Sequence, residues 1–172
     1  MPVPLPPVLN VWVPWTHLAP ETQGFAQMIG AHLAQVEPTE GYARFMAERW
    51  REGAAFVVVE HDVVPTVGQV AEIWACPEPL CCYGYEGEDR RTLLFGCVKF
   101  SSGLIARTAP IWADFIAAED APEGHPHHDF SAARCRRWMM LPEWFDHWFA
   151  PAVYPFHWHG RVRHLALSAG SR

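Results

Sequence analysis

The sequence predicts a three-layer α/β fold, in which helices flank a mostly parallel sheet. Short apolar runs rich in β-branched residues alternate along the chain with segments of helical spacing, as in strand–helix repeats. Half of the 172 residues are hydrophobic, which is enough for one core in a single domain. We therefore expect one domain at 8–167, between a proline-rich arm at 1–7 and a tail at 168–172.

The first elements are a strand and a helix. The run 8–13 is largely apolar and predicts a strand that Pro14 ends. Apolar residues at helical spacing then predict a helix from Glu21 to Gln35, with Thr22 as its N-cap.

The next elements surround an apolar run. A helix is expected from Tyr42 to Glu52 and should stop at Gly53. The six apolar residues at 54–59 are typical of a buried strand. Thr66 is placed to cap a short helix at 67–75. The remaining expected elements are strands at 80–85 and 93–100, a helix from Ser101 or Ser102 to about 118 that Pro110 kinks or splits, a polar loop at 119–128, helices at 130–140 and 142–149, and an extended segment at 155–167.

Two carboxylates, Glu60 and Asp62, stand at the end of the buried strand with His61 between them. Ligands of open α/β sheets bind beside the carboxyl ends of the strands. Neighbouring carboxylates repel each other unless a cation or strong donors compensate them. The pattern therefore predicts a divalent-metal site that would hold phosphates, although an acidic turn after a strand would look the same. An extended backbone would point His61 to the opposite side.

Three histidines near the end of the chain are further candidate ligands. His157 and His159 would share one face of an extended segment, and His164 follows as a reserve. Imidazole together with carboxylates suits a manganese-like ion. The alternative is that these side chains simply pack on the domain. Asp129, before a predicted helix, is either an N-cap or a general base.

Composition excludes several classes of protein. The formal charge of −6 gives no broad basic surface for nucleic acid. The apolar runs are too short to span a membrane, and the start of the chain lacks a signal-peptide pattern, so we expect a cytoplasmic protein. The five cysteines form no Cys-x-x-Cys pair. This disfavours a structural zinc ribbon and predicts reduced, buried thiols.

The chain resembles small glycosyltransferase-like proteins of the GT-A type (family 2-like) from actinobacteria and their phages. The likeness rests on the strand end Phe56–Pro65 with Glu-His-Asp, followed by Cys81–Tyr85 and the Gly-Cys-x-x-Phe pattern within Leu94–Phe100. An aspartate before a helix, Asp129, and a late histidine-rich strand complete the order over roughly 8–165.

The resemblance implies a metal-bound nucleotide-sugar site. Asp62 would be the direct ligand of Mn²⁺ or Mg²⁺, Glu60 its supporter, and His157 or His159 the late histidine. The metal would bridge the diphosphate of a UDP- or GDP-sugar as a Lewis acid.

Other roles follow from the same resemblance. Asp129 would be the base of an inverting enzyme, and Gly96 and Cys97 would line the floor where sugar or acceptor approaches. The segment with Pro14 and Thr16 would hold the nucleotide base. The acceptor, whether a glycan, a protein or a modified nucleobase, is left open.

Two other functions remain open. The chain is short for such an enzyme, with only two clear strands up to the motif, so its nucleotide-binding half would be abbreviated. It could therefore be a non-catalytic accessory or interaction protein on a degenerate glycosyltransferase fold. A metallohydrolase is disfavoured because no HxxEH or HExxH spacing occurs.

Overall fold

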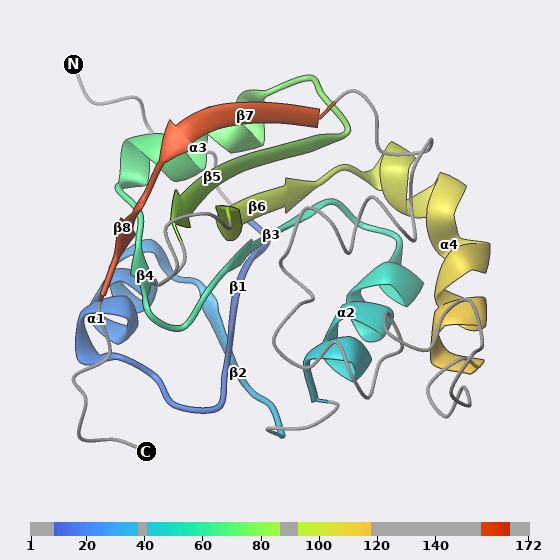
Figure 1. Cartoon of the computed structure of the whole chain (residues 1–172), viewed down its shortest axis with the longest axis horizontal. Coiled ribbons are helices and arrows are strands. Elements are labelled where there is room, and N and C mark those ends of the chain that lie inside the picture. Colours follow the sequence, from blue (N-terminus) through green and yellow to red (C-terminus); the bar gives the residue numbers. More distant parts are fainter. Residues whose placement is uncertain (1–8, 38–40, 87–92, 118–155, 166–172) are drawn as a thin grey trace.

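The computed structural model describes residues 9–37, 41–86, 93–117 and 156–165. Strands and helices alternate along much of this part of the chain (Figure 1). In chain order they are β1 (Val11–Trp15), α1 (Pro20–Ile29), β2 (His32–Gln35), α2 (Gly41–Glu52), β3 (Phe56–Val59), β4 (Val63–Val64), α3 (Val67–Ala75), β5 (Leu80–Glu86), β6 (Leu93–Phe100), α4 (Ser102–Ala117), β7 (Phe156–Arg161) and β8 (Arg163–His164).

The main sheet has six strands in the order β2-β1-β3-β6-β5-β7. Only β6 runs against the others, since it pairs antiparallel with both β3 and β5 while the remaining pairs are parallel. The carboxyl ends of β1, β2, β3, β5 and β7 therefore share one edge. The prediction of an α/β fold with a mostly parallel sheet is confirmed.

Helices cover both faces of this sheet. On one face α2 and α4 pack on Phe56 and Val58, and on the other α1 and α3 pack on Val57 and Val59. These four neighbours alternate between the faces because successive side chains of a strand point to opposite sides. Figure 1 shows α2 and α4 together on one side of the sheet and α1 and α3 on the other.

A two-stranded antiparallel ribbon, β4–β8, stands apart from the main sheet. It pairs Val63 with His164 and Val64 with Arg163. Figure 1 shows β8 continuing from β7 down to β4, close to α1. The ribbon thus joins the chain after β3 to the chain after β7.

The predicted helix from Glu21 to Gln35 is wrong in its second half. The helix α1 ends at Ile29 because Gly30 adopts a left-handed conformation, with φ of 68°, and its N–H caps the last turn. The next residues form β2, which pairs parallel with β1. Thr22 is also not the N-cap. It is buried within the first turn and its hydroxyl donates to the carbonyl of Val63 at 3.1 Å.

Pro14 does not end the first strand, because β1 continues to Trp15. Proline has no N–H, so it is tolerated only where the ladder does not need one. On the β3 side, β1 pairs only through Val11 and Trp12. Pro14 lies beyond this pairing. On the opposite side of β1, Pro14 is paired with Ala34 of β2.

The motif itself is a turn rather than an extended segment. The N–H of Val63 donates to the carbonyl of Glu60 at 3.1 Å, and the carbonyl of His61 accepts from Ala19 at 3.1 Å. Side chains alternate between the two sides of an extended strand, and this alternation would point His61 away from the carboxylates. It does not apply to a turn. Its Nδ1 is buried without a hydrogen-bond partner among the described residues.

Several other expectations are confirmed. A capping box between Thr66 and Gln69 starts α3, and Gly53 follows α2 with φ of 73°. The helix α4 runs through Pro110, so the alternative in which this proline splits the helix is wrong. The loop at 119–128 and the helices at 130–140 and 142–149 lie outside the described residues.

In the part that is described, no helix has the length and apolar character needed to cross a membrane.

Candidate functional site

Glu60 and Asp62 lie where the parallel strands end, directly after β3. Tyr85 comes to the same place from the end of β5, and His164 comes from β8. The ribbon holds this arrangement, since Val63 pairs with His164 and the N–H of Leu165 donates to the carbonyl of Asp62 at 2.8 Å. Three segments of the chain thus meet at one edge of the sheet.

Asp62 is buried, with 7% of its surface exposed. Its Oδ2 lies 3.2 Å from Nε2 of His164, a residue 102 positions away in the chain. Its Oδ1 is buried and has no hydrogen-bond partner in the described part of the chain. A buried carboxylate needs compensation on its oxygens, so Oδ1 marks a place for a cation or a donor.

Glu60 is held by a tyrosine. The hydroxyl of Tyr85 donates to Oε2 of Glu60, and the Tyr85 ring stacks on His164 with centroids 4.3 Å apart and planes at 8°. Burial raises the pKa of Glu60 to about 8, and the charge of Asp62 adds to this, while the Tyr85 hydrogen bond opposes it. Glu60 is therefore largely neutral at pH 7.

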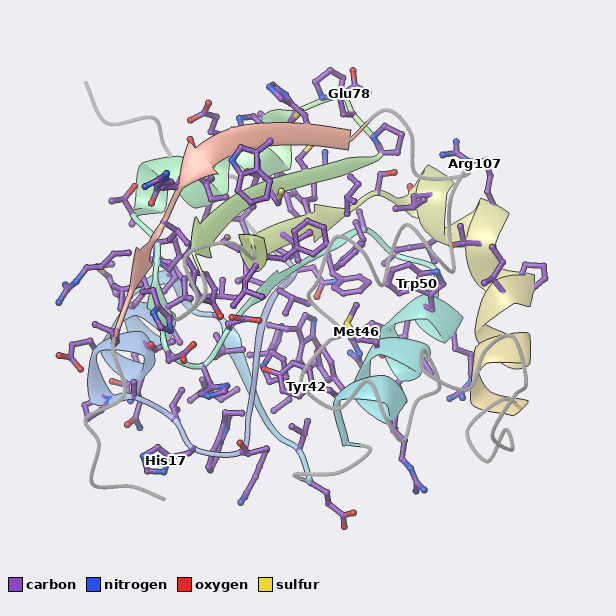
Figure 2. All side chains as sticks on the ribbon, in the orientation of Figure 1. His17, Tyr42, Met46, Trp50, Glu78 and Arg107 are labelled. Carbon is purple, nitrogen blue, oxygen red and sulfur yellow. The ribbon has the colours of Figure 1, made fainter. Side chains whose placement is uncertain are left out.

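The carboxylates also act on Tyr42 of α2. Burial raises the pKa of the Tyr42 hydroxyl well above its usual value, and Glu60 and Asp62 raise it further. This hydroxyl donates to the carbonyl of Pro14 at 2.8 Å, so α2 reaches the end of β1. Figure 2 shows Tyr42 and Met46 directed from α2 toward the sheet. The adjacent indole N–H of Trp15 is buried without a partner among the described residues.

The other predicted residues of this edge have mixed placements. Thr16 is exposed just after β1. The carbonyl of Gly96 accepts from the N–H of Glu60 at 3.0 Å. A Cβ at Gly96 would lie 2.5 Å from Cγ1 of Val162, so packing alone requires a glycine here. Cys97 is fully buried in the core, beneath the edge rather than on it.

The two histidines expected to complete the metal site lie elsewhere. Nδ1 of His157 is 3.4 Å from Sγ of Cys76, and Nδ1 of His159 is 3.0 Å from Oε1 of Glu72. The structure therefore does not bring them together with Glu60 and Asp62. The reserve candidate His164 is the histidine beside Asp62. Asp129 lies outside the described residues.

A second group of ligand atoms appears at the other end of β5 and β7. Sγ of Cys76, Sγ of Cys81 and a ring nitrogen of His159 all lie within 4.8 Å of one another. It is the only such group of three among the residues that the structure describes. The sequence interpretation missed it because the cysteines are not spaced as Cys-x-x-Cys. The signal for this group in the sequence was the His-x-His pattern of His157 and His159 in β7.

Comparisons with protein-family models, with curated protein sequences and with solved structures found no match for this chain.

Proposed function

We propose that this protein is a metal-dependent glycosyltransferase that uses a nucleotide-sugar, with Asp62 and His164 as the protein ligands of Mn²⁺ or Mg²⁺. One observation carries the proposal. Oδ2 of Asp62 and Nε2 of His164 lie 3.2 Å apart at the carboxyl edge of the sheet, while Oδ1 of Asp62 is buried without a partner in the described part of the chain.

This donor set fits a hard divalent cation that also binds phosphates. Such ions take one or two carboxylates from the protein and complete an octahedron with substrate oxygens and water, and Mn²⁺ also accepts imidazole. Neighbouring octahedral ligands at about 2.2 Å from the ion lie about 3.1 Å apart. The distance between Asp62 and His164 is close to this value.

The surrounding residues suit a diphosphate. Before the cation binds, a Glu60 with its pKa near 8 limits the negative charge at this edge. Tyr85 fixes both Glu60 and the ring of His164. The bound ion would stabilise the leaving nucleoside diphosphate as a Lewis acid.

The end of β1 is the proposed place for the nucleotide base. Parallel strands bring Trp15 and Thr16 to the edge that carries Glu60 and Asp62. The Trp15 indole provides a flat ring and an N–H donor that has no partner among the described residues. A flat ring can stack on a base, and an N–H donor can bind one of the acceptors of the base. The role of Asp129 as the base of an inverting reaction stays a prediction.

Calorimetric titration of UDP- and GDP-sugars with and without Mn²⁺ tests this proposal. We expect binding that needs the metal and that falls at least tenfold in Asp62→Asn and in His164→Gln. The matched control is Glu21→Gln, which removes an exposed carboxylate of α1 and should bind as the wild type does. Binding that is independent of Mn²⁺ or unchanged in Asp62→Asn would overturn the proposal.

Release of the nucleoside diphosphate separates an enzyme from a non-catalytic relative. We expect turnover that Asp62→Asn abolishes while its circular dichroism spectrum stays unchanged. Metal-dependent binding without any turnover, over a panel of acceptors and with water alone, would instead identify an accessory protein on the same fold.

A further inference from the structure

We infer that Cys76, Cys81, His159 and His157 form a zinc site that fastens β7 to α3 and β5. The inference is independent of the proposed transferase, because none of these residues belongs to the Asp62 edge. Zinc favours thiolate and imidazole ligands in a tetrahedral arrangement.

The fold brings these side chains to one face of the sheet. Cys76 caps the C-terminus of α3, and Cys81 follows five residues later near the start of β5. The parallel pairing of β5 with β7 places His157 directly beside Cys81. His159 lies two residues further along the strand, and its ring centroid is 4.0 Å from that of His157. Figure 2 labels Glu78 in the connection between the two cysteines.

The distances bring three of the four proposed ligands close to one another and place His157 beside Cys76. Both sulfurs and a nitrogen of His159 lie within 4.8 Å of one another, and Nδ1 of His157 is 3.4 Å from Sγ of Cys76. Tetrahedral ligands with zinc bonds of 2.0–2.3 Å lie about 3.3–3.8 Å apart. Small side-chain adjustments would thus be enough to admit the ion.

His159 is oriented as a metal ligand. Its side chain is only 6% exposed, and its Nδ1 lies 3.0 Å from Oε1 of Glu72. The hydroxyl of Tyr83 donates to the other oxygen of Glu72 at 2.6 Å. The remaining nitrogen, Nε2, is buried without a hydrogen-bond partner in the described residues. Zinc-bound histidines commonly donate their second nitrogen to a carboxylate in this way.

Charge in the cluster also suits zinc. Two thiolates and two neutral imidazoles balance a divalent ion. The ammonium group of the buried Lys99 donates to the carbonyl of Cys76. The four protein ligands leave no open position, which is typical of a structural rather than a catalytic zinc.

Metal analysis of the purified, reduced protein tests the site. We expect one zinc per chain after dialysis, and loss of this zinc in Cys76→Ser and in His159→Gln. Cys82→Ala is the matched control, since Cys82 neighbours Cys81 but points to the opposite face of the sheet, and it should retain zinc. In Glu72→Gln we expect about tenfold weaker binding, because Glu72 only orients His159.

Cobalt binding to the wild-type protein tests the site even if one of the variants does not fold. Wild-type protein reconstituted with Co²⁺ should show thiolate-to-cobalt charge transfer and the intense visible bands of tetrahedral coordination. Absence of these bands in the reduced protein would overturn the inference. So would zinc that persists in Cys76→Ser but is lost in Asp62→Asn, since this would place the ion at the other site.

Discussion

At the residue scale, five buried side-chain atoms lack hydrogen-bond partners among the described residues, and two of these atoms lie at the candidate metal sites. Oδ1 of Asp62 and Nε2 of His159 are both buried, and each belongs to a side chain whose other polar atom is engaged. Such atoms are costly unless something satisfies them. Oδ1 of Asp62 lies in an oxygen-rich site, whereas Nε2 of His159 belongs to the group with two sulfurs. The two positions therefore suit different ions.

The sequence located the two carboxylates at a strand end, but it named the histidine beside Asp62, His164, only as a reserve. Glu60 and Asp62 were recognisable because two carboxylates end a buried strand. His157, His159 and His164 are equivalent in sequence, and only tertiary structure separates them. A register shift between Cys82 and Tyr83 and the pairing in the ribbon decide which histidine reaches which site.

Glu60 gives a prediction about pH. Its pKa is raised to about 8 in the folded protein, so between pH 4.5 and 8 the folded state binds more protons than the unfolded state. The contribution of Glu60 to the free energy of unfolding must then fall as pH rises through this range. In metal-free protein with a chelator we expect a fall on the order of 2 kcal/mol, reduced by solvent because the side chain is only half-buried.

Urea denaturation at pH 5 and pH 8 measures this fall. Glu60→Gln should remove the Glu60 contribution, so the two curves of the variant should differ less than those of the wild type. An equal difference in both proteins would show that Glu60 does not carry the effect.

Gly96 gives a prediction about packing. A methyl group there would lie 2.5 Å from Val162 and 2.9 Å from Tyr85, so Gly96→Ala should destabilise the fold by about 1–3 kcal/mol. Gly103→Ala is the control because a Cβ meets nothing within 4 Å at that helical position, and it should be neutral or stabilising. Equal denaturation midpoints for both variants would contradict the packing account of Gly96.

At the scale of elements, the sequence predicted those that carry their own start or stop signals. Thr66 with Gln69 at the start of α3 is one example, and Gly53 after α2 is another. The strand β2 was missed because Leu33 continues the apolar spacing of the preceding helix. Gly30 was the signal against that helix, since its positive φ ends α1 and frees the next residues to pair with β1.

The cap of α3 gives the prediction at this scale. Thr66 accepts from the N–H of Gln69 at 3.1 Å, and the Gln69 side chain accepts from the N–H of Thr66 at 2.8 Å. Thr66→Ala should therefore cost about 1 kcal/mol in the free energy of unfolding. Ser102→Ala is the control, because at α4 the neighbouring Ser101 accepts from Leu104. A loss in Ser102→Ala as large as in Thr66→Ala would contradict this assignment of caps.

At the scale of the whole molecule, β7 connects the two candidate metal sites. The strand β7 carries His157 and His159, and the chain beyond its end carries His164 to Asp62 through β8. The class of fold followed from alternating strand and helix patterns. The order of the strands could not be predicted from these patterns. The position of β6 between β3 and β5 depends on long-range pairing that no local pattern encodes.

Zinc should stabilise the whole fold. An ion that binds only the folded state adds about 2.7 kcal/mol at a free concentration one hundred times its Kd. We expect zinc to raise the unfolding temperature of the reduced wild type and to leave that of Cys76→Ser unchanged. Thermal unfolding followed by circular dichroism measures both, and an equal shift in the two proteins would argue against ligation by Cys76.

The most direct measurement of the central claim is a crystal structure of the protein with Mn²⁺ and UDP or GDP, analysed by anomalous scattering. We predict a manganese peak about 2.2 Å from a carboxylate oxygen of Asp62 and from Nε2 of His164, with diphosphate oxygens in the remaining positions. A nucleotide bound away from this edge, or no manganese between Asp62 and His164, would contradict the account.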